Sequence, residues 1–286
     1  MSSGDQHAMM TSPLQILKEI KKRGLHAEHG GHYDDPVTQK SREFDIRTIS
    51  EYGNDMRVVL AVECKNIKPH FPLIISATPR EQFESYLSFI SDSEFNKLRP
   101  EKDLMGYANI SSALERTTQP CRYAICDLYP VGGMVGRSTA QVGKNLQGEI
   151  VANDAEIYEK WGQAVSSIKK AIEWLPRRDD GTISDAIEIL GCALPFVVVP
   201  DGMLWIAEYS KNGDVVTGPK QVDRISCICG KKYEFGSPFG WHYRISHIEF
   251  VTKTGLLNFI DTYMKDAETV NKTFFASKNR LNDYRR

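Results

Sequence analysis

Three charged residues on either side of one turn are the strongest candidates for chemistry in this sequence. Asp45 lies in the segment EFDIRTISEY, and Glu63 and Lys65 lie in MRVVLAVECK, beyond Gly53-Asn54-Asp55. Carboxylate oxygens bind hard cations such as Mg²⁺, and a lysine beside them can orient or deprotonate an attacking water. Together these residue types suit metal-assisted hydrolysis of a phosphodiester.

Alternation in the two segments predicts a β-hairpin that positions these charges. Gly53-Asn54-Asp55 is typical of a hairpin turn. Side chains alternate across a strand, so Glu63 and Lys65 share one face of the second strand. The opposite face is apolar and consists of Val58, Leu60, Val62 and Cys64.

The first strand fixes where Asp45 lies in this hairpin. Phe44 and Ile46 share its apolar face, so Asp45 lies on the charged one. If the apolar faces of both strands coincide, Asp45 is directly across from Glu63. Side chains opposed in this way lie about 5 Å apart, and two like charges there destabilise a sheet. Such carboxylates either share a proton or bind a cation, and the backbone carbonyl of Cys64 could be a further ligand.

Asp45 followed by Glu63-Cys64-Lys65 resembles the PD-(D/E)XK nuclease superfamily, the restriction endonuclease-like fold. In that family an acidic residue on one strand and E-x-K on the next form the active site. The preceding YDDPVTQKSREFD is similar to the turn that leads into the Asp strand, although Phe44 stands where the motif has Pro. The resemblance covers roughly residues 12 to 91, in an order of helix, strands and helix.

The resemblance implies a role for each residue of the motif. Asp45 and Glu63 would be Mg²⁺ ligands, with Mn²⁺ as a substitute, and Lys65 would be the catalytic lysine. Family members often add a Glu from the first helix, and Glu19 is the best match here. The implied function is a Mg²⁺-dependent nuclease that hydrolyses nucleic-acid phosphodiester bonds, with DNA as the expected substrate and defence or repair as the role by analogy. Dimerisation would suit an enzyme that cuts two strands.

Basic residues outside the motif are candidate contacts to substrate phosphates, which position a nucleic acid without reading its bases. They are Lys40, Arg42, Arg80, Arg137 and Lys144. Two other functions stay open. One is a non-catalytic nucleic-acid- or protein-binding module that retains the fold. The other is a nucleotide site at VGGMVGRST, which departs from a P-loop because Val131 replaces the first Gly and Arg137 the Lys.

Composition is that of a soluble globular protein. The chain has 286 residues, 26% charged and 41% hydrophobic, with a net charge of −1. Nucleic-acid contacts must therefore come from local basic groups rather than a global positive field. No apolar run approaches the roughly 20 residues that cross a bilayer, and MSSGDQHAMM lacks the features of a signal peptide. We expect no membrane contact and a cytoplasmic location.

Hydrophobic periodicity and turn residues predict the remaining elements. Helices are expected at 13–23, from Thr78-Pro79 to about Ile90, and at 103–115, 157–175, 183–190 and 254–267. Extended segments or strands are expected at 25–33, 72–76, 122–128, on both sides of Pro200-Asp201-Gly202, at 224–229 and at 244–251, and a Gly-rich loop at 129–148.

This order predicts an α/β protein with a restriction endonuclease-like mixed central sheet flanked by helices. We expect flexible ends at 1–11 and 276–286 around a single domain, 12–275. Within it lie the core motif at 12–91, a helical insertion at 100–182, and C-terminal strands and a helix at 193–270.

Overall fold

The computed structural model describes residues 12–35, 39–53, 56–67, 71–91, 121–124, 127–144, 147–153, 155–175, 190–235 and 241–275. These residues form a mixed α/β fold with one large mixed sheet and few helices. The helices are α1 (Pro13–Lys22), α4 (Ala155–Trp174), α5 (Lys253–Tyr263) and α6 (Ala267–Val270), with a 3-10 turn η1 (Gln82–Glu84) and a π-helical turn η3 (Asn271–Phe275).

Most strands belong to the large sheet. They are β1 (Ala27–His29), β4 (Ile46–Tyr52), β5 (Met56–Cys64), β6 (Leu73–Pro79), β7 (Leu87–Ser91), β8 (Cys121–Ala124), β9 (Met134–Lys144), β10 (Ile150–Asn153), β11 (Leu190–Val199), β12 (Leu204–Tyr209), β13 (Val215–Gln221), β14 (Arg224–Phe235) and β15 (Trp241–Thr252). The short strands β2 (His32–Asp34) and β3 (Ser41–Glu43) pair with each other in a separate hairpin.

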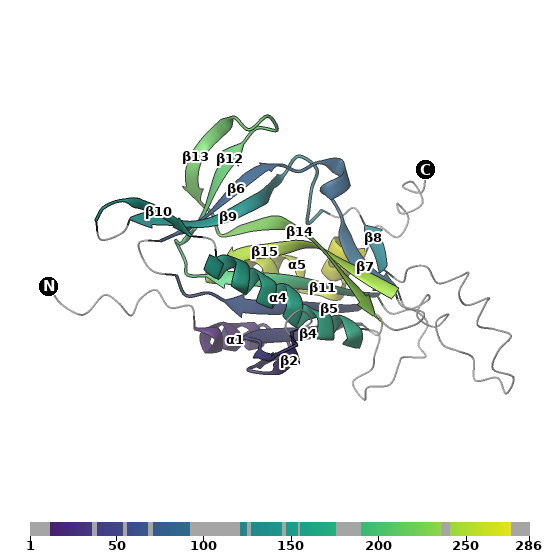
Figure 1. The fold of residues 1–286 in the computed structure, drawn as a ribbon. Helices are drawn as coiled ribbons and strands as arrows, with labels where there is room; N and C mark the ends of the chain where they lie inside the picture. Colours follow the sequence, from purple (N-terminus) through teal and green to yellow (C-terminus); the bar gives the residue numbers. More distant parts are fainter. Residues whose placement is uncertain are drawn as a thin grey trace, which may run out of the picture.

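The large sheet mixes parallel and antiparallel pairs: β5, β11 and β15 are parallel at its centre, and β14 with β9 and β6 with β12 are further parallel pairs. Its neighbouring strands run in the order β1-β4-β5-β11-β15-β14-β9-β6-β12-β13, with β7, β8 and β10 attached beside this path (Figure 1). Strand β11 is parallel to both β5 and β15, whereas β4 and β14 are antiparallel to their inner neighbours. All residues of β11 are buried. Burial on both faces explains why LGCALPFVVV is an almost continuous apolar run.

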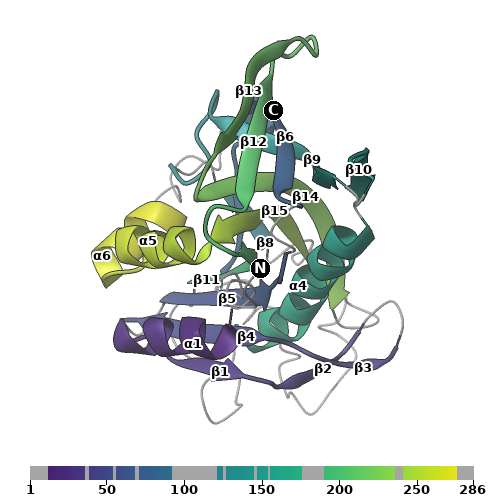
Figure 2. The ribbon, with the colours of Figure 1, turned by 90° about the vertical axis from the view of Figure 1, so that its left-hand side faces the viewer.

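Helices cover both faces of the sheet centre. Helices α1, α5 and α6 lie on one face and α4 on the other (Figure 2). Two core clusters match this arrangement: Ile16 and Leu256 belong to the first, and Val165 and Ile172 to the second. The predicted sheet flanked by helices is therefore confirmed at the level of a mixed α/β fold.

Two predicted helices form close to their expected bounds. In α1, Pro13 occupies the first turn, and Ile16 and Ile20 are buried one turn apart. Ser12 is at the N-cap, but its side chain makes no capping hydrogen bond. Helix α4 buries the periodic face that was expected for 157–175.

The predicted helix from Thr78 to about Ile90 is wrong. Strand β6 continues to Pro79, and after η1 the chain enters β7. Phe83, expected on the buried helix face, is 71% exposed, whereas Leu87 and Phe89 are buried two residues apart. Apolar residues spaced by three and four suit a turn followed by a strand as well as they suit a helix.

The predicted Gly-rich loop at 129–148 is also wrong, because most of it is β9. Of the strand predicted at 122–128, only the part within β8, which ends at Ala124, is confirmed. The last helix, expected at 254–267, divides into α5 and α6. The helix expected at 103–115 and both flexible ends lie outside the described residues. So does the helix expected at 183–190, except for Leu190, which begins β11.

Candidate functional site

The predicted hairpin forms in the predicted register. Strands β4 and β5 are antiparallel, and Ile46 pairs with Val62. Asp45 lies at a bend immediately before β4, where the paired register ends; continued by one residue, that register would set Asp45 opposite Glu63, the penultimate residue of β5. The predicted register is therefore confirmed for the paired residues of the two strands, and the opposition of the two carboxylates stays a prediction.

A hydrogen bond fixes Asp45 at the end of the hairpin. Its Oδ2 accepts from the backbone N–H of Cys64 at 2.7 Å. The N–H and C=O of one strand residue point to the same strand edge, so the Cys64 carbonyl is also directed towards Asp45. The carboxylate of Asp45 is thus held beside the peptide that follows Glu63.

Glu63 is on the strand face that alternation predicts, but that face is covered. Val59 and Ala61 share this face and pack in the core beneath α4. The Glu63 side chain is only 1% exposed. Burying an ionised carboxylate is costly unless nearby positive charge or hydrogen-bond donors compensate for the lost water.

Arg47 supplies positive charge near Glu63. It is two residues from Asp45 on the same face of β4, and it is buried. Its guanidinium lies 4.0 Å from the centre of the Phe44 ring. Burial lowers the pKa of Arg47, while the carboxylates of Glu28 and Glu63 act in the opposite direction. The buried arginine therefore offsets part of the cost of burying the Glu63 carboxylate.

The β2–β3 hairpin adds a tyrosine and a third carboxylate to the neighbourhood. Tyr33 and Asp35 are buried, and Arg42 forms an ion pair with Asp35 at 3.1 Å. Burial raises the pKa of Tyr33, and the negative charges of Glu63 and Asp35 raise it further. Tyr33 therefore stays protonated at neutral pH and acts as a hydrogen-bond donor.

Backbone carbonyls of α4 receive hydrogen bonds from side chains beneath the helix. The helix continues through each acceptor residue, so these hydrogen bonds attach α4 to the sheet without interrupting the helix. The donors are Tyr33 to Gln163 at 3.4 Å, Tyr233 to Val165 at 2.7 Å, and Arg47 to Ser167 at 2.8 Å. The groups around Glu63 thus also determine where α4 lies.

Lys65 follows directly after β5. Its backbone N–H donates to the Val198 carbonyl of β11 at 2.7 Å, and its side chain is half-buried. The three motif residues therefore come together at one end of β5, where β4 and β11 flank it.

The donor set fits a hard cation in its chemistry. Asp45 and Glu63 offer carboxylate oxygens and Cys64 a carbonyl oxygen, and Mg²⁺ usually keeps several waters beside one or two carboxylates. No group of three or more His, Cys, Asp or Glu side chains in the described part of the chain is arranged to hold a metal. A cation here would therefore depend on water and substrate oxygens for the rest of its coordination.

Glu19 does not join this group. It pairs with Lys22 at 2.7 Å and with Arg23 at 3.6 Å. Arg23 in turn pairs with Asp261 of α5 at 2.7 Å. These contacts place Glu19 on the face that carries α1 and α5, whereas Glu63 faces α4.

The predicted phosphate contacts differ in their accessibility. Arg80 is only 3% exposed and donates to Ser226 Oγ at 2.5 Å, and Arg137 forms an ion pair with Glu84. Both guanidinium groups thus hold loops and strands together. Lys40 and Lys144 are exposed, and Arg42 is occupied by Asp35.

The P-loop alternative is contradicted by the secondary structure. A P-loop binds phosphate at the N-terminus of a helix. Here Gly136, Arg137 and Ser138 lie within β9, which is followed by the antiparallel strand β10. The backbone N–H groups of a phosphate-binding loop are therefore engaged in a sheet instead.

Sequence reasoning missed Tyr33, Asp35 and Arg47. Arg47 shares the charged strand face with Asp45, which was the one available signal.

Comparisons of the chain with protein-family models, with curated proteins and with solved structures found no match. No helix in the described segments is long and apolar enough to cross a membrane.

Proposed function

We propose that this protein is a divalent-metal-dependent nuclease with a restriction endonuclease-like fold, and that DNA is its substrate. The observation that carries the proposal is the Asp45 carboxylate, which accepts a hydrogen bond from the amide of Cys64, the residue that follows Glu63. Two carboxylates and a lysine at one strand end are the groups that the resemblance requires.

The order of elements supports the proposed fold. Helix α1 is followed by β1, β4 and β5, which are successive antiparallel neighbours in the sheet. Helix α4 then leads to β11, which lies parallel to β5. This agrees with the helix, strands and helix of the resemblance, except that the second helix comes after β6 to β10 rather than near Thr78.

Each residue of the site has a defined task in this proposal. Asp45 and Glu63 would hold Mg²⁺ or Mn²⁺, with the Cys64 carbonyl as a further ligand. When bound, the cation supplies positive charge against the charge that develops on the phosphate oxygens. Lys65 would orient the attacking water, and Arg47 and Tyr33 hold the covering helix in place.

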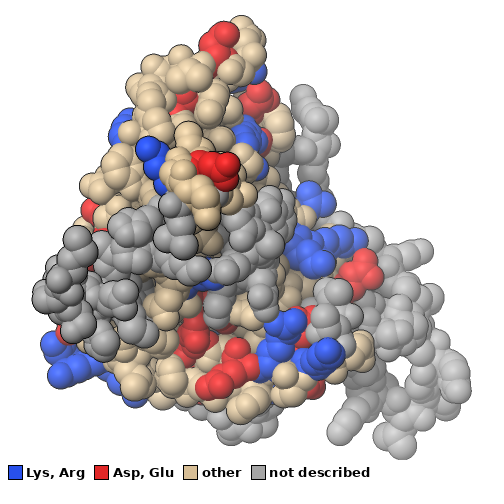
Figure 3. Space-filling view, turned by 60° about the vertical axis from the view of Figure 1, so that its left-hand side comes forward, with Lys and Arg blue, Asp and Glu red and all other residues tan. Residues whose placement is uncertain are grey.

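Surface charge suits local contacts with a nucleic acid. On the face seen in Figure 3, Lys and Arg side chains lie in separate groups interspersed with Asp and Glu. This distribution agrees with the net charge of −1. A substrate would therefore be held by a few phosphate contacts near the site rather than by a broad positive surface.

The burial of Glu63 favours a second candidate, a binding module that retains the fold without catalysis. A carboxylate that is 1% exposed and lies near a buried arginine could be a structural charge pair. The two candidates differ in whether the site binds a divalent cation through Asp45 and Glu63.

Cleavage and metal binding together test the proposal. Supercoiled, linear and single-stranded DNA and RNA would be incubated with Mg²⁺, Mn²⁺ or EDTA, using the wild type, Asp45→Ala and Lys65→Ala. We expect metal-dependent cleavage of DNA that both substitutions abolish. The matched control is Glu51→Ala, which removes an exposed carboxylate at the other end of the same hairpin and should leave cleavage intact.

Calorimetry with Mn²⁺ separates the two candidates. The nuclease requires binding that Asp45→Ala and Glu63→Gln weaken and that Glu51→Ala does not. Cleavage that persists in Asp45→Ala and Lys65→Ala would refute the proposed site. No cleavage together with no Mn²⁺ binding would favour the non-catalytic module.

A further inference from the structure

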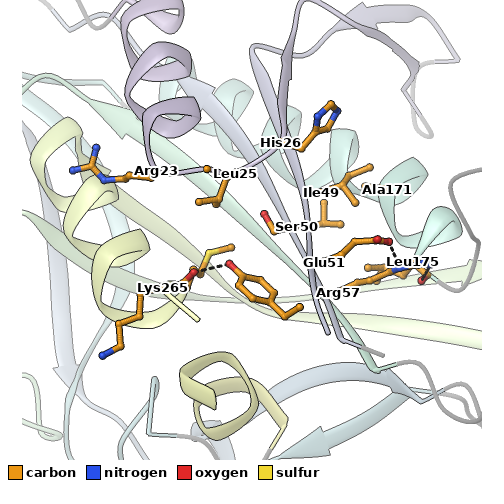
Figure 4. A pocket seen from close by; sticks show the side chains of 14 residues that line it. Arg23, Leu25, His26, Ile49, Ser50, Glu51, Arg57, Ala171, Leu175 and Lys265 are labelled. Carbon is orange, nitrogen blue, oxygen red and sulfur yellow. Dashed lines mark hydrogen bonds and ion pairs between the residues drawn. The ribbon is translucent and has the colours of Figure 1, made fainter. Parts of the chain in front are cut away.

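A cavity of about 750 Å³ lies at the turn end of the β4–β5 hairpin, away from Asp45 and Glu63 (Figure 4). Its lining includes Ser50, Glu51 and Tyr52 of β4. The predicted catalytic residues are at the opposite end of these strands. The cavity is therefore separate from the proposed nuclease site, although its volume is within the range of ligand pockets.

The cavity is next to an open strand edge. Strand β1 covers β4 only from Ile46 to Thr48, and the next bond joins Ile49 N–H to the His26 carbonyl at 3.3 Å. Beyond His26 the chain turns away into the connection with α1. In the described part of the chain, no strand continues along β4 beside Glu51.

Backbone geometry sets the direction of the hydrogen-bonding groups at this edge. The N–H of Ile49 points outwards, to β1. Strand N–H groups alternate between the two edges, so the N–H and C=O of Glu51 point outwards as well. They face the cavity at the place where a longer β1 would have paired with them.

The cavity is lined from both faces of the sheet. Leu25 and Met264 belong to the core beneath α1 and α5, whereas Ala171 and Leu175 belong to the core beneath α4. A space lined by both cores must lie around the sheet edge. An added strand would place its alternate side chains into the two halves of this space, one on each face.

We propose that this edge binds an extended acidic peptide of a partner protein, which adds a strand beside β4. Backbone groups of Glu51 hydrogen-bond the peptide, its apolar side chains enter the half of the cavity lined by Ala171 and Leu175, and the acidic side chains between them enter the other half, near Lys265. This inference does not depend on the nuclease function.

Charge in the lining selects an acidic partner. Three cations, Arg23, Arg57 and Lys265, line the cavity beside one carboxylate, Glu51. Arg57 pairs with Glu51 at 2.7 Å, and Arg23 pairs with Asp261 at 2.7 Å. Lys265 is exposed and forms no ion pair with the described residues, so it can receive a carboxylate from the peptide.

The probe is a fluorescein-labelled peptide of about six residues, the usual length of a strand, that alternates valine and aspartate. Its binding to the full chain would be followed by fluorescence anisotropy. We expect a Kd on the order of 10–100 μM, and no binding of a peptide that alternates valine and lysine.

Glu51→Pro removes the outward N–H and should weaken binding at least about tenfold. Its control, Glu51→Ala, removes the same side chain but keeps that N–H, and should bind the probe at least as tightly as the wild type, because Arg57 loses its carboxylate partner. Since proline could disturb β4, Lys265→Glu is a second test, and it should also weaken binding at least about tenfold. Lys18→Glu on α1 is the matched charge control.

The proposal is overturned by equal binding in all four variants, or by no binding of the acidic probe to the wild type at about 1 mM. It is also overturned if the wild type self-associates through this edge, with dimers that Glu51→Pro dissociates and the probe does not. The occupant would then be a second copy of the chain.

Discussion

His247 is a buried histidine whose environment predicts how the stability of this protein depends on pH. It lies in β15, is 1% exposed, and stacks on Tyr129 with ring centres 3.8 Å apart. Burial lowers its pKa to about 2, and the positive charges of Arg80, Arg224 and Arg137 contribute to the same shift. The imidazole is therefore neutral in the folded protein at any pH near neutrality.

The sign of the effect follows from proton binding. The unfolded chain takes up a proton at this residue below its ordinary pKa of 6.5, whereas the folded chain does not until the pH approaches 2. Stability is therefore fully present above pH 6.5 and falls as the pH decreases. At pH 5, 1.5 units below the ordinary value, the loss is about 2 kcal/mol at 1.36 kcal/mol per unit. The loss of stability at pH 5 is the same for any pKa of His247 in the folded protein that is well below 5.

Urea unfolding of His247→Phe and the wild type at pH 8 and pH 5 measures this effect. Phenylalanine keeps the aromatic contact with Tyr129, and neither ring nitrogen of His247 hydrogen-bonds to the described residues. We expect the variant to lose about 2 kcal/mol less than the wild type between the two pH values. His29→Asn, an exposed histidine in β1, should lose as much as the wild type. The same pH dependence in His247→Phe and the wild type would refute the reasoning.

Five further substitutions test the packing around the candidate site and the helices. Arg47→Met removes the cation near buried Glu63 and the bond to Ser167, and should lower the free energy of unfolding by about 3 kcal/mol in urea titrations. Tyr233→Phe should cost about 1 kcal/mol and Tyr33→Phe less, because their bonds to α4 measure 2.7 and 3.4 Å; equal losses would contradict this order. Gly162→Ala, with open space around its new Cβ, should stabilise α4 by about 0.5–1 kcal/mol. Gly255→Ala, whose Cβ would be 1.9 Å from the Asp223 carbonyl oxygen, should destabilise by about 3 kcal/mol in thermal unfolding.

The hairpin was predictable because local signals determine it. Gly53, in the turn, has a φ of 65°, which favours glycine, and the two-residue period of a strand fixes which side chains of β5 share a face. Together they set the register from which Asp45 is predicted opposite Glu63. The long periodic helix α4 was predictable for the same reason, since its buried residues recur at helical spacing.

Strand β9 was not predictable, because a glycine in it is required by packing against residues that are distant in the sequence. A Cβ at Gly136 would lie 2.2 Å from Cys227 Sγ and 2.7 Å from a methyl carbon of Ile75. The glycine is therefore required where β9 packs closely against its neighbours, not where a loop bends. Glycines of both kinds look alike in a sequence.

Local sequence patterns also could not predict that α4 covers the site. Tyr33 and Arg47 bond to carbonyls 130 and 120 residues away along the chain. A backbone carbonyl carries no residue-specific signal, so these acceptors on α4 could not be identified before the fold was known. Parity placed Arg47 on the charged face, but nothing local indicated that this face would be buried.

The two carboxylates of the motif are stabilised by different means, and this difference has a functional consequence. A backbone N–H donates to Asp45, and the positive charge of Arg47 acts on Glu63. Under the proposed function, a cation at Glu63 would be repelled by the nearby charge of Arg47, which also forms an ion pair with Glu28 at 3.8 Å. Arg47→Met should therefore bind Mn²⁺ more tightly than the wild type in calorimetry even though it is less stable. Stability and metal affinity that fall together would instead mean that Arg47 only supports the fold around the site.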